Sequence, residues 1–124
     1  MAAEVTRIAP RESVWLDPHR IETIYAQFGG AEAQALLERA MNEVYVIRHE
    51  LAQQYDARDF EAFARNLRRL RRIGQHLGMP MISRISEDVG RALAAGDATA
   101  MAATWARLRR NADQALSGEW EVEP

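Results

Sequence analysis

Residues 60–78, FEAFARNLRRLRRIGQHLG, decide the fold of this chain. The apolar positions of this stretch are separated alternately by three and four residues, and they are Phe60, Phe63, Leu67, Leu70, Gly74 and Leu77. This spacing places them on one face of an α-helix. A helix with such a face typically packs against antiparallel neighbours. The stretch therefore predicts one helix of a helical bundle.

Four further helices are predicted from the same periodicity and from helix start and stop signals. An aspartate can cap a helix, proline suits the first helical position, and glycine ends helices. The predicted helices run from Asp17-Pro18 to Gly29-Gly30, over roughly residues 32–55, from Asp56 or Asp59 to Gly78, from Pro80 to Gly96, and from Asp97 to Ser117-Gly118.

The connections between these helices are short, so successive helices should be antiparallel neighbours. No run of alternating β-branched and polar residues is present, and we expect no strand. The predicted fold is all-α: an antiparallel up-and-down four-helix bundle, with an additional short N-terminal helix that covers one end. Residues 14–118 form this domain. Residues 1–13 are expected to be a flexible segment and residues 119–124 a frayed acidic tail.

The composition narrows the possible functions. A length of 124 residues corresponds to one domain, and the absence of cysteine excludes disulfides, thiol nucleophiles and zinc–thiolate sites. There is no apolar run long enough to span a membrane and no secretory leader, so we expect a cytoplasmic protein.

Charge is unevenly distributed along the chain. The formal net charge is −2, yet residues 58–84 contain seven arginines against Asp59 and Glu61. That segment carries +5 and the remainder −7. A split of this kind indicates a local surface for an acidic partner more than general nucleic-acid binding, which usually accompanies a basic domain.

The arginine-rich helix resembles the phosphorylation motif of histidine-phosphotransfer (HPt) domains. That motif reads His-x-Leu-Lys-Gly, with a further glycine ten positions after the histidine. Counting back ten residues from Gly78 gives Arg68, and Leu70 and Arg71 then match the leucine and lysine. The resemblance extends over about residues 14–117. It includes Ile82, Ser86 and Val89 in the next helix and Gly96-Asp97, Leu108 and Leu116 around the last.

Two departures from the HPt motif bear on function. Arg68 stands where the family has its phosphorylated histidine, and a guanidinium has no lone pair available to attack a phosphoryl group. Arg72 replaces a small residue that lets a receiver domain approach. Arg71, in contrast, retains the positive charge of the family's lysine. The resemblance therefore implies a degenerate, non-enzymatic pseudo-HPt domain.

The predicted partner-binding residues all belong to this helix, and they are Arg65, Arg68, Arg69, Arg71, Arg72, Gln75 and His76. Five of these positions (65, 68, 69, 72 and 76) form one stripe at helical spacing. We expect no acid within the helix to offset the stripe, since Asp59 and Glu61 precede it. The alternative is a solvated face, partly paired with acids such as Glu43, Glu50 or Glu87 of neighbouring helices.

The expected function is binding to a response-regulator receiver domain or a histidine kinase, which would modulate a two-component phosphorelay. One alternative is active phosphotransfer through His76 in a different register. Another is binding of nucleic acid or a different polyanion by the arginine stripe. No catalytic residue, metal site or cofactor is predicted, because phosphate-loop and dinucleotide fingerprints and paired Glu-x-x-His motifs are missing.

Overall fold

The computed structural model describes residues 14–118 and 120–122. In chain order, its elements are β1 (Val14–Leu16), α2 (Pro18–Phe28), α3 (Gly30–Asp56), α4 (Phe60–His76), α5 (Pro80–Ala94), α6 (Ala98–Leu116) and β2 (Trp120–Val122). The five predicted helices are all present, with ends within a few residues of those expected. The prediction of an all-α fold is confirmed for the domain itself, and two three-residue strands, β1 and β2, flank its helices.

Aspartate caps set the starts of three helices. The side chain of Asp17 accepts a hydrogen bond from the amide of His19, that of Asp59 from Ala62, and that of Asp97 from Ala100. These bonds satisfy amides that have no partner within the helix. Pro18 and Pro80 occupy the first turns of α2 and α5, where no amide donor is needed.

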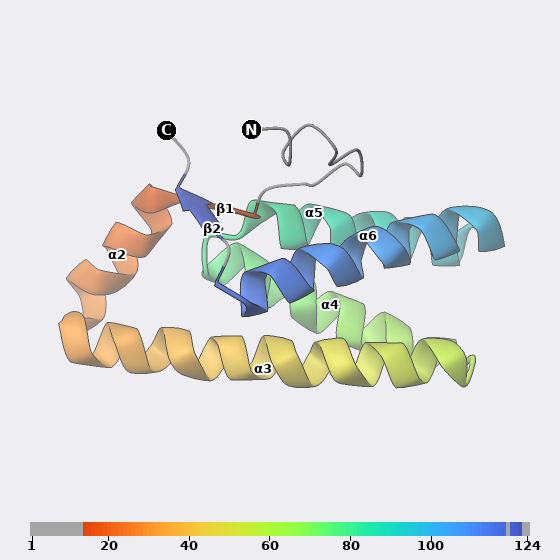
Figure 1. Cartoon of the computed structure of the whole chain (residues 1–124), viewed down its shortest axis with the longest axis horizontal. Helices are drawn as coiled ribbons and strands as arrows, with labels where there is room; N and C mark the ends of the chain where they lie inside the picture. The colour runs from red at the N-terminus through yellow and green to blue at the C-terminus, as the bar shows by residue number, and fades with distance from the viewer. Residues whose placement is uncertain (1–13, 119, 123–124) are drawn as a thin grey trace, which may run out of the picture.

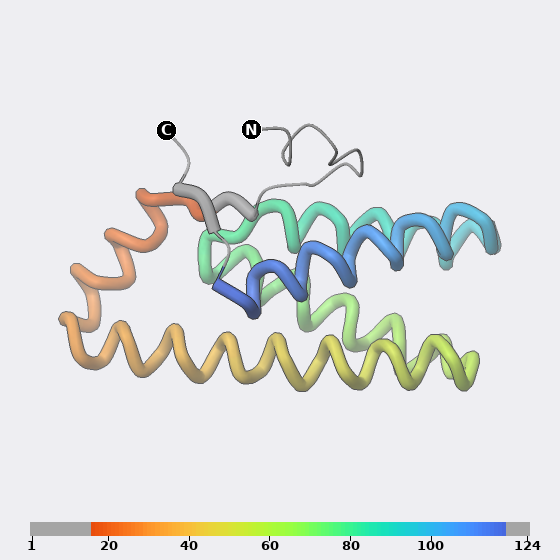
Figure 2. Tube along the Cα trace, in the orientation of Figure 1, coloured from red at the N-terminus to blue at the C-terminus, as the bar shows by residue number. Residues whose placement is uncertain are grey.

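Successive helices from α3 to α6 reverse direction (Figure 1, Figure 2). Packing is most extensive between α4 and α5, followed by α5 with α6 and α3 with α4, and α3 also contacts α6. Their buried side chains form one core, in which Phe63 of α4 and Trp105 of α6 lie with ring centroids 5.4 Å apart. Trp105 lies on the buried face of α6 and is 3 % exposed.

The turn between α4 and α5 is held close to α2. Gly78 has φ +72°, a conformation that favours glycine, and its carbonyl accepts a hydrogen bond of 2.7 Å from the amide of Asp17. Arg20 Nε donates to the carbonyl of His76 at 2.8 Å. In Figure 1, α2 accordingly runs across one end of the helices, between the start of α3 and the α4–α5 turn.

The expectation that the chain contains no strand was wrong for two short segments. Val14–Leu16 and Trp120–Val122 pair in parallel, with Val14 opposite Trp120 and Leu16 opposite Val122. Residues 120–122 therefore pair with another part of the chain, in contrast to the frayed tail expected for 119–124. Three residues are too few to show an alternating pattern, and the pairing joins distant parts of the chain. Residues 1–13, 119, 123 and 124 lie outside the described residues.

Candidate functional site

Helix α4 presents a buried face and a charged face. Phe63, Leu67 and Leu70 are at most 3 % exposed, whereas Arg68 and Arg72 point away from the core and are exposed. The alternation of three and four residues that predicted the helix also separates these faces. The seven predicted site residues thus lie on or beside one exposed surface, but their surroundings differ.

Arg65 is paired within its own helix. Its Nη1 lies 3.1 Å from Oε1 of Glu61, one turn earlier, and both side chains are largely exposed. The expectation that no acid of the helix offsets the arginines was wrong here, because positions four apart on a helix are neighbours. An exposed pair of this type contributes only about 0.3–0.5 kcal/mol.

Arg69 leans toward α3. Its guanidinium lies 3.4 Å from Oε2 of Glu43 and donates to Oδ1 of Asn66 at 3.0 Å. The buried Asn66 amide in turn donates to Glu50 and Gln54. The predicted partner Glu43 is thus confirmed, whereas Glu50 accepts a hydrogen bond from Asn66.

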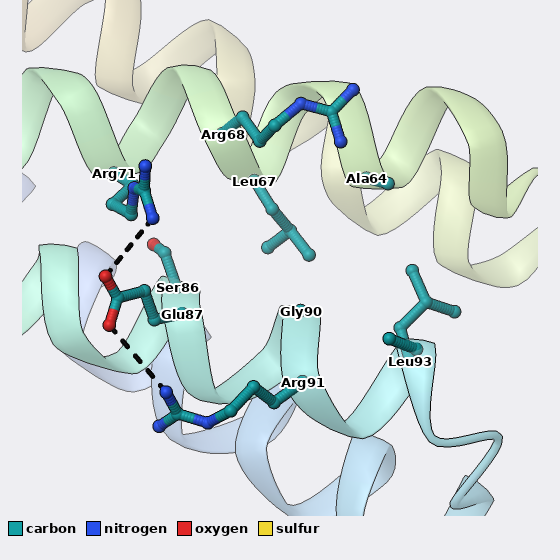
Figure 3. Close-up of a pocket in the computed structure, with 10 residues that line it drawn as sticks. Ala64, Leu67, Arg68, Arg71, Ser86, Glu87, Gly90, Arg91 and Leu93 are labelled. Carbon is teal, nitrogen blue, oxygen red and sulfur yellow. Dashed lines mark hydrogen bonds and ion pairs between the residues drawn. The ribbon is translucent and has the colours of Figure 1, made fainter.

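Arg71 leans the opposite way, toward α5, and donates a hydrogen bond to Oε2 of Glu87 at 3.2 Å (Figure 3). The alternative prediction, a solvated face partly paired with acids of neighbouring helices, named Glu87 as one such acid. The other oxygen of Glu87, Oε1, lies 3.8 Å from Arg91. Arg91 also pairs with Asp88, whose other oxygen lies 3.6 Å from Arg107 of α6. A chain of ion pairs therefore connects α4, α5 and α6.

Arg68 and Arg72 are the two arginines of the stripe whose charge no carboxylate of the described residues pairs with. Among the side chains that the structure describes, neither has a hydrogen-bond or ion-pair partner. They lie one turn apart on the same face. Figure 3 shows Arg68 extending along α4 toward Ala64, away from Arg71. Of the four arginines in the predicted stripe, Arg65 and Arg69 are thus paired, and Arg68 and Arg72 have no partner among the described side chains. Arg71, beside the stripe, is also paired.

Gln75 and His76 lie at the C-terminal end of α4, beyond Arg68 and Arg72. Gln75 is exposed and lines a small hollow with Asp17 and Arg84. His76 is exposed and lines a separate, more apolar hollow with Arg20 and Phe28. The two residues share α4 with Arg68 but do not converge with it on one cavity.

A groove between α4 and α5 lies directly beside Arg68. Its volume is about 630 Å³, and its lining comprises Ala64, Leu67, Arg68, Arg71, Ser86, Glu87, Gly90, Arg91, Leu93 and Ala94 (Figure 3). Gly90, Arg91 and Leu93 were not among the predicted site residues. A glycine in a helix interior was the available signal, since glycine disfavours helix.

The described residues contain no group of three or more histidine, aspartate or glutamate side chains arranged to hold a metal ion. No helix within residues 14–118 combines the length and apolar character needed to cross a lipid bilayer.

Comparison of the chain with protein-family models, with curated proteins and with solved structures finds no match.

Proposed function

We propose that this protein is a pseudo-HPt domain: a non-catalytic signalling protein with an up-and-down four-helix bundle of the HPt type. It would bind a receiver domain or a histidine kinase through the surface around Arg68 and thereby modulate a two-component phosphorelay. The observation that carries the proposal is Arg68 itself, exposed and without a partner among the described side chains.

The register that places Arg68 at the histidine position depends on Gly78. This glycine has a structural requirement, since a Cβ there would lie 3.2 Å from the carbonyl oxygen of Asp17 and 3.0 Å from Cβ of Arg20. Its positive φ ends α4 where the HPt motif has its second glycine. These two features support counting the motif back from Gly78 to Arg68.

The charges favour a small acidic site on the partner. Arg65, Arg69 and Arg71 are already paired with carboxylates, so the arginines of α4 without a partner among the described side chains are Arg68 and Arg72. In the family's partners, the phospho-acceptor pocket of a receiver is a cluster of acidic side chains. Arg68 would enter that pocket in place of the phosphohistidine. A shielded charge-assisted hydrogen bond there contributes about 1.5–3 kcal/mol.

The same pairing weighs against a polyanion ligand. Nucleic acids are held by many simultaneous phosphate contacts. An α4 surface on which three arginines are engaged with Glu43, Glu61 and Glu87 supplies few such contacts. The proposal therefore remains a protein partner with a localised acidic pocket.

Binding of the host's receiver domains to wild type and to Arg68→Glu, measured by isothermal titration calorimetry, tests the proposal. We expect Arg68→Glu to weaken binding by about tenfold to a hundredfold. The matched control is Arg110→Glu, since Arg110 is exposed on α6 and has no partner among the described side chains. Equal binding by wild type and Arg68→Glu, or equal losses in both variants, would contradict the proposal.

Incubation with phosphorylated receivers separates this proposal from phosphotransfer by His76. Acid-labile phosphate that appears on wild type and disappears in His76→Gln would establish the alternative function. We expect no such phosphate.

A further inference from the structure

Gly90 occupies a position where helix packing does not require a glycine. It lies inside α5, and a Cβ built there would meet no heavy atom within 4 Å. Glycine lowers stability in a helix interior relative to alanine. At Gly74 of α4, by comparison, a Cβ would lie 3.0 Å from the amide nitrogen of Ser83, so close packing explains that glycine. Gly90 instead leaves space.

Gly90 lies at the bottom of the α4–α5 groove, and the space left by its missing side chain is part of the groove. The groove volume of about 630 Å³ lies within the range of small-molecule sites, about 300–1,000 Å³. Much of its wall is apolar and comes from both helices: Ala64 and Leu67 from α4, Leu93 and Ala94 from α5. Apolar walls with a few polar groups are typical of sites for small organic ligands.

Two polar atoms of the lining are buried without a partner. They are the hydroxyl oxygen of Ser86, a residue 2 % exposed, and Nε of Arg71. Buried polar atoms in folded proteins nearly always have hydrogen-bond partners. In Figure 3 the two side chains face each other at one end of the groove. Both can donate hydrogen bonds, so this end is suited to an acceptor group.

The charges around the groove favour an anionic acceptor. Arg68, Arg71 and Arg91 line it, and Glu87 is the opposing acid. Glu87 is shared between Arg71 and Arg91, which leaves Arg68 uncompensated at the rim. The groove therefore combines an apolar body, a donor-lined end and net positive charge.

From these features we infer that the α4–α5 groove binds a small amphipathic anion, such as a medium-chain carboxylate. Its apolar part lies over Gly90 against Leu67 and Leu93. Its carboxylate lies at the Ser86 end of the groove, where a turn of the Arg71 side chain exposes Ser86 Oγ and Arg71 Nε as donors to it, and Arg68 supplies the balancing charge. The inference does not rest on the receiver partner proposed above, although Arg68 takes part in both.

A titration of the ¹⁵N-labelled full chain with octanoate, followed by amide chemical shifts, tests this site. We expect saturable shifts of the Gly90 and Ser86 amides and of their groove neighbours. Octanol lacks the charge and acetate lacks the apolar chain. Each should bind at least about tenfold more weakly than octanoate, since the ligand uses both features.

Three variants locate the site. Gly90→Leu fills the groove and should weaken octanoate binding at least about tenfold, because its side chain takes the volume of the ligand's apolar body. It should remain folded, since nothing adjoins the new Cβ. Ser86→Ala and Arg68→Ala should each weaken binding about fivefold. The control Ala103→Leu, at an exposed position of α6, should bind like wild type.

Absence of saturable shifts would overturn the inference. So would shifts centred on the hollow between α2, α3 and α4 near Ile24 and Phe28, or octanoate binding unchanged in a folded Gly90→Leu. Because octanoate is titrated without any receiver, failure here leaves the result of the receiver experiment untouched, and the reverse also holds.

Discussion

The two ends of the α4–α5 pair differ in how closely the helices approach. At the end near the connecting turn, the amide nitrogen of Ser83 and the carbonyl oxygen of Met79 lie 3.0 and 3.1 Å from where a Cβ of Gly74 would be. At the other end, nothing lies within 4 Å of a Cβ at Gly90, and the groove beside Arg68 opens. One helix pair thus contains a closed end and an open end.

The difference shows that two glycines of one helix pair can have opposite effects on packing. Gly74 is required for the backbones to meet, whereas Gly90 keeps a volume free. Both lower intrinsic helix stability, but only Gly74 is compensated by packing within the described chain. At the open end, which also holds the Ser86 hydroxyl with no hydrogen-bond partner, packing among the described residues does not offset the lower helix stability of a glycine.

The largest expected contrast comes from truncating one apolar side chain at each end. Ile82 is fully buried at the closed end, and Ile82→Ala should lower the free energy of unfolding by about 3 kcal/mol. Leu93 is half-buried at the open end, and Leu93→Ala should lower the free energy of unfolding by less than about half the loss expected for Ile82→Ala. Urea denaturation of both variants measures the contrast; equal losses would show that the groove end is packed as tightly as the turn.

Overpacking the closed end should also destabilise. In Gly74→Val, the added side chain meets backbone atoms of Met79 and Ser83, and we expect a loss of about 2 kcal/mol. Urea denaturation should show a lower midpoint for Gly74→Val than for wild type, with the same dependence of the unfolding free energy on urea concentration. A variant as stable as wild type would mean that α5 can move away from α4 at little cost.

The same kind of change at the open end should have the opposite sign. Gly90→Ala adds a methyl group into empty space and removes a poor helix former, so the free energy of unfolding should rise by about 1 kcal/mol. Differential scanning calorimetry would then show a transition roughly 3–5 °C higher. A lower transition temperature would indicate that Gly90 makes a close approach after all.

The smallest effect is expected from the ion pairs at the groove edge. Arg71 and Glu87 are each about two-fifths exposed, so Glu87→Gln should change stability by less than about 1 kcal/mol. The difference from wild type should shrink further in high salt. Glu61→Gln, which removes the more exposed partner of Arg65, is the matched comparison and should change stability even less.

Much of the helical framework could be predicted from the sequence. The apolar spacing of residues 60–77 located α4 and its buried face, and the Asp-Pro and Gly-Asp pairs located the ends of α2, α5 and α6. These signals are local, because helix periodicity and capping depend on residues within a few positions of one another. They also identified Arg68 and Arg72 as surface residues.

The partners of the arginines were only partly predictable. Glu43 and Glu87 were among several acids that could have reached the stripe, and Glu61 was dismissed although it lies one turn before Arg65. Which acid pairs with which arginine depends on how α3, α4 and α5 are rotated against each other. The pairing of Val14–Leu16 with Trp120–Val122 likewise joins the two ends of the described chain, and no local pattern encodes it.

The sequence by itself determined five helices, their apolar faces and an exposed arginine stripe that includes position 68, because each follows from residue type and short-range spacing. Only the tertiary structure decided that Arg68 lacks a partner among the described side chains, and that a groove opens between Leu67 and Gly90. The physical reason is that free charge and empty volume are properties of surfaces facing each other, and those surfaces exist only once the helices have packed.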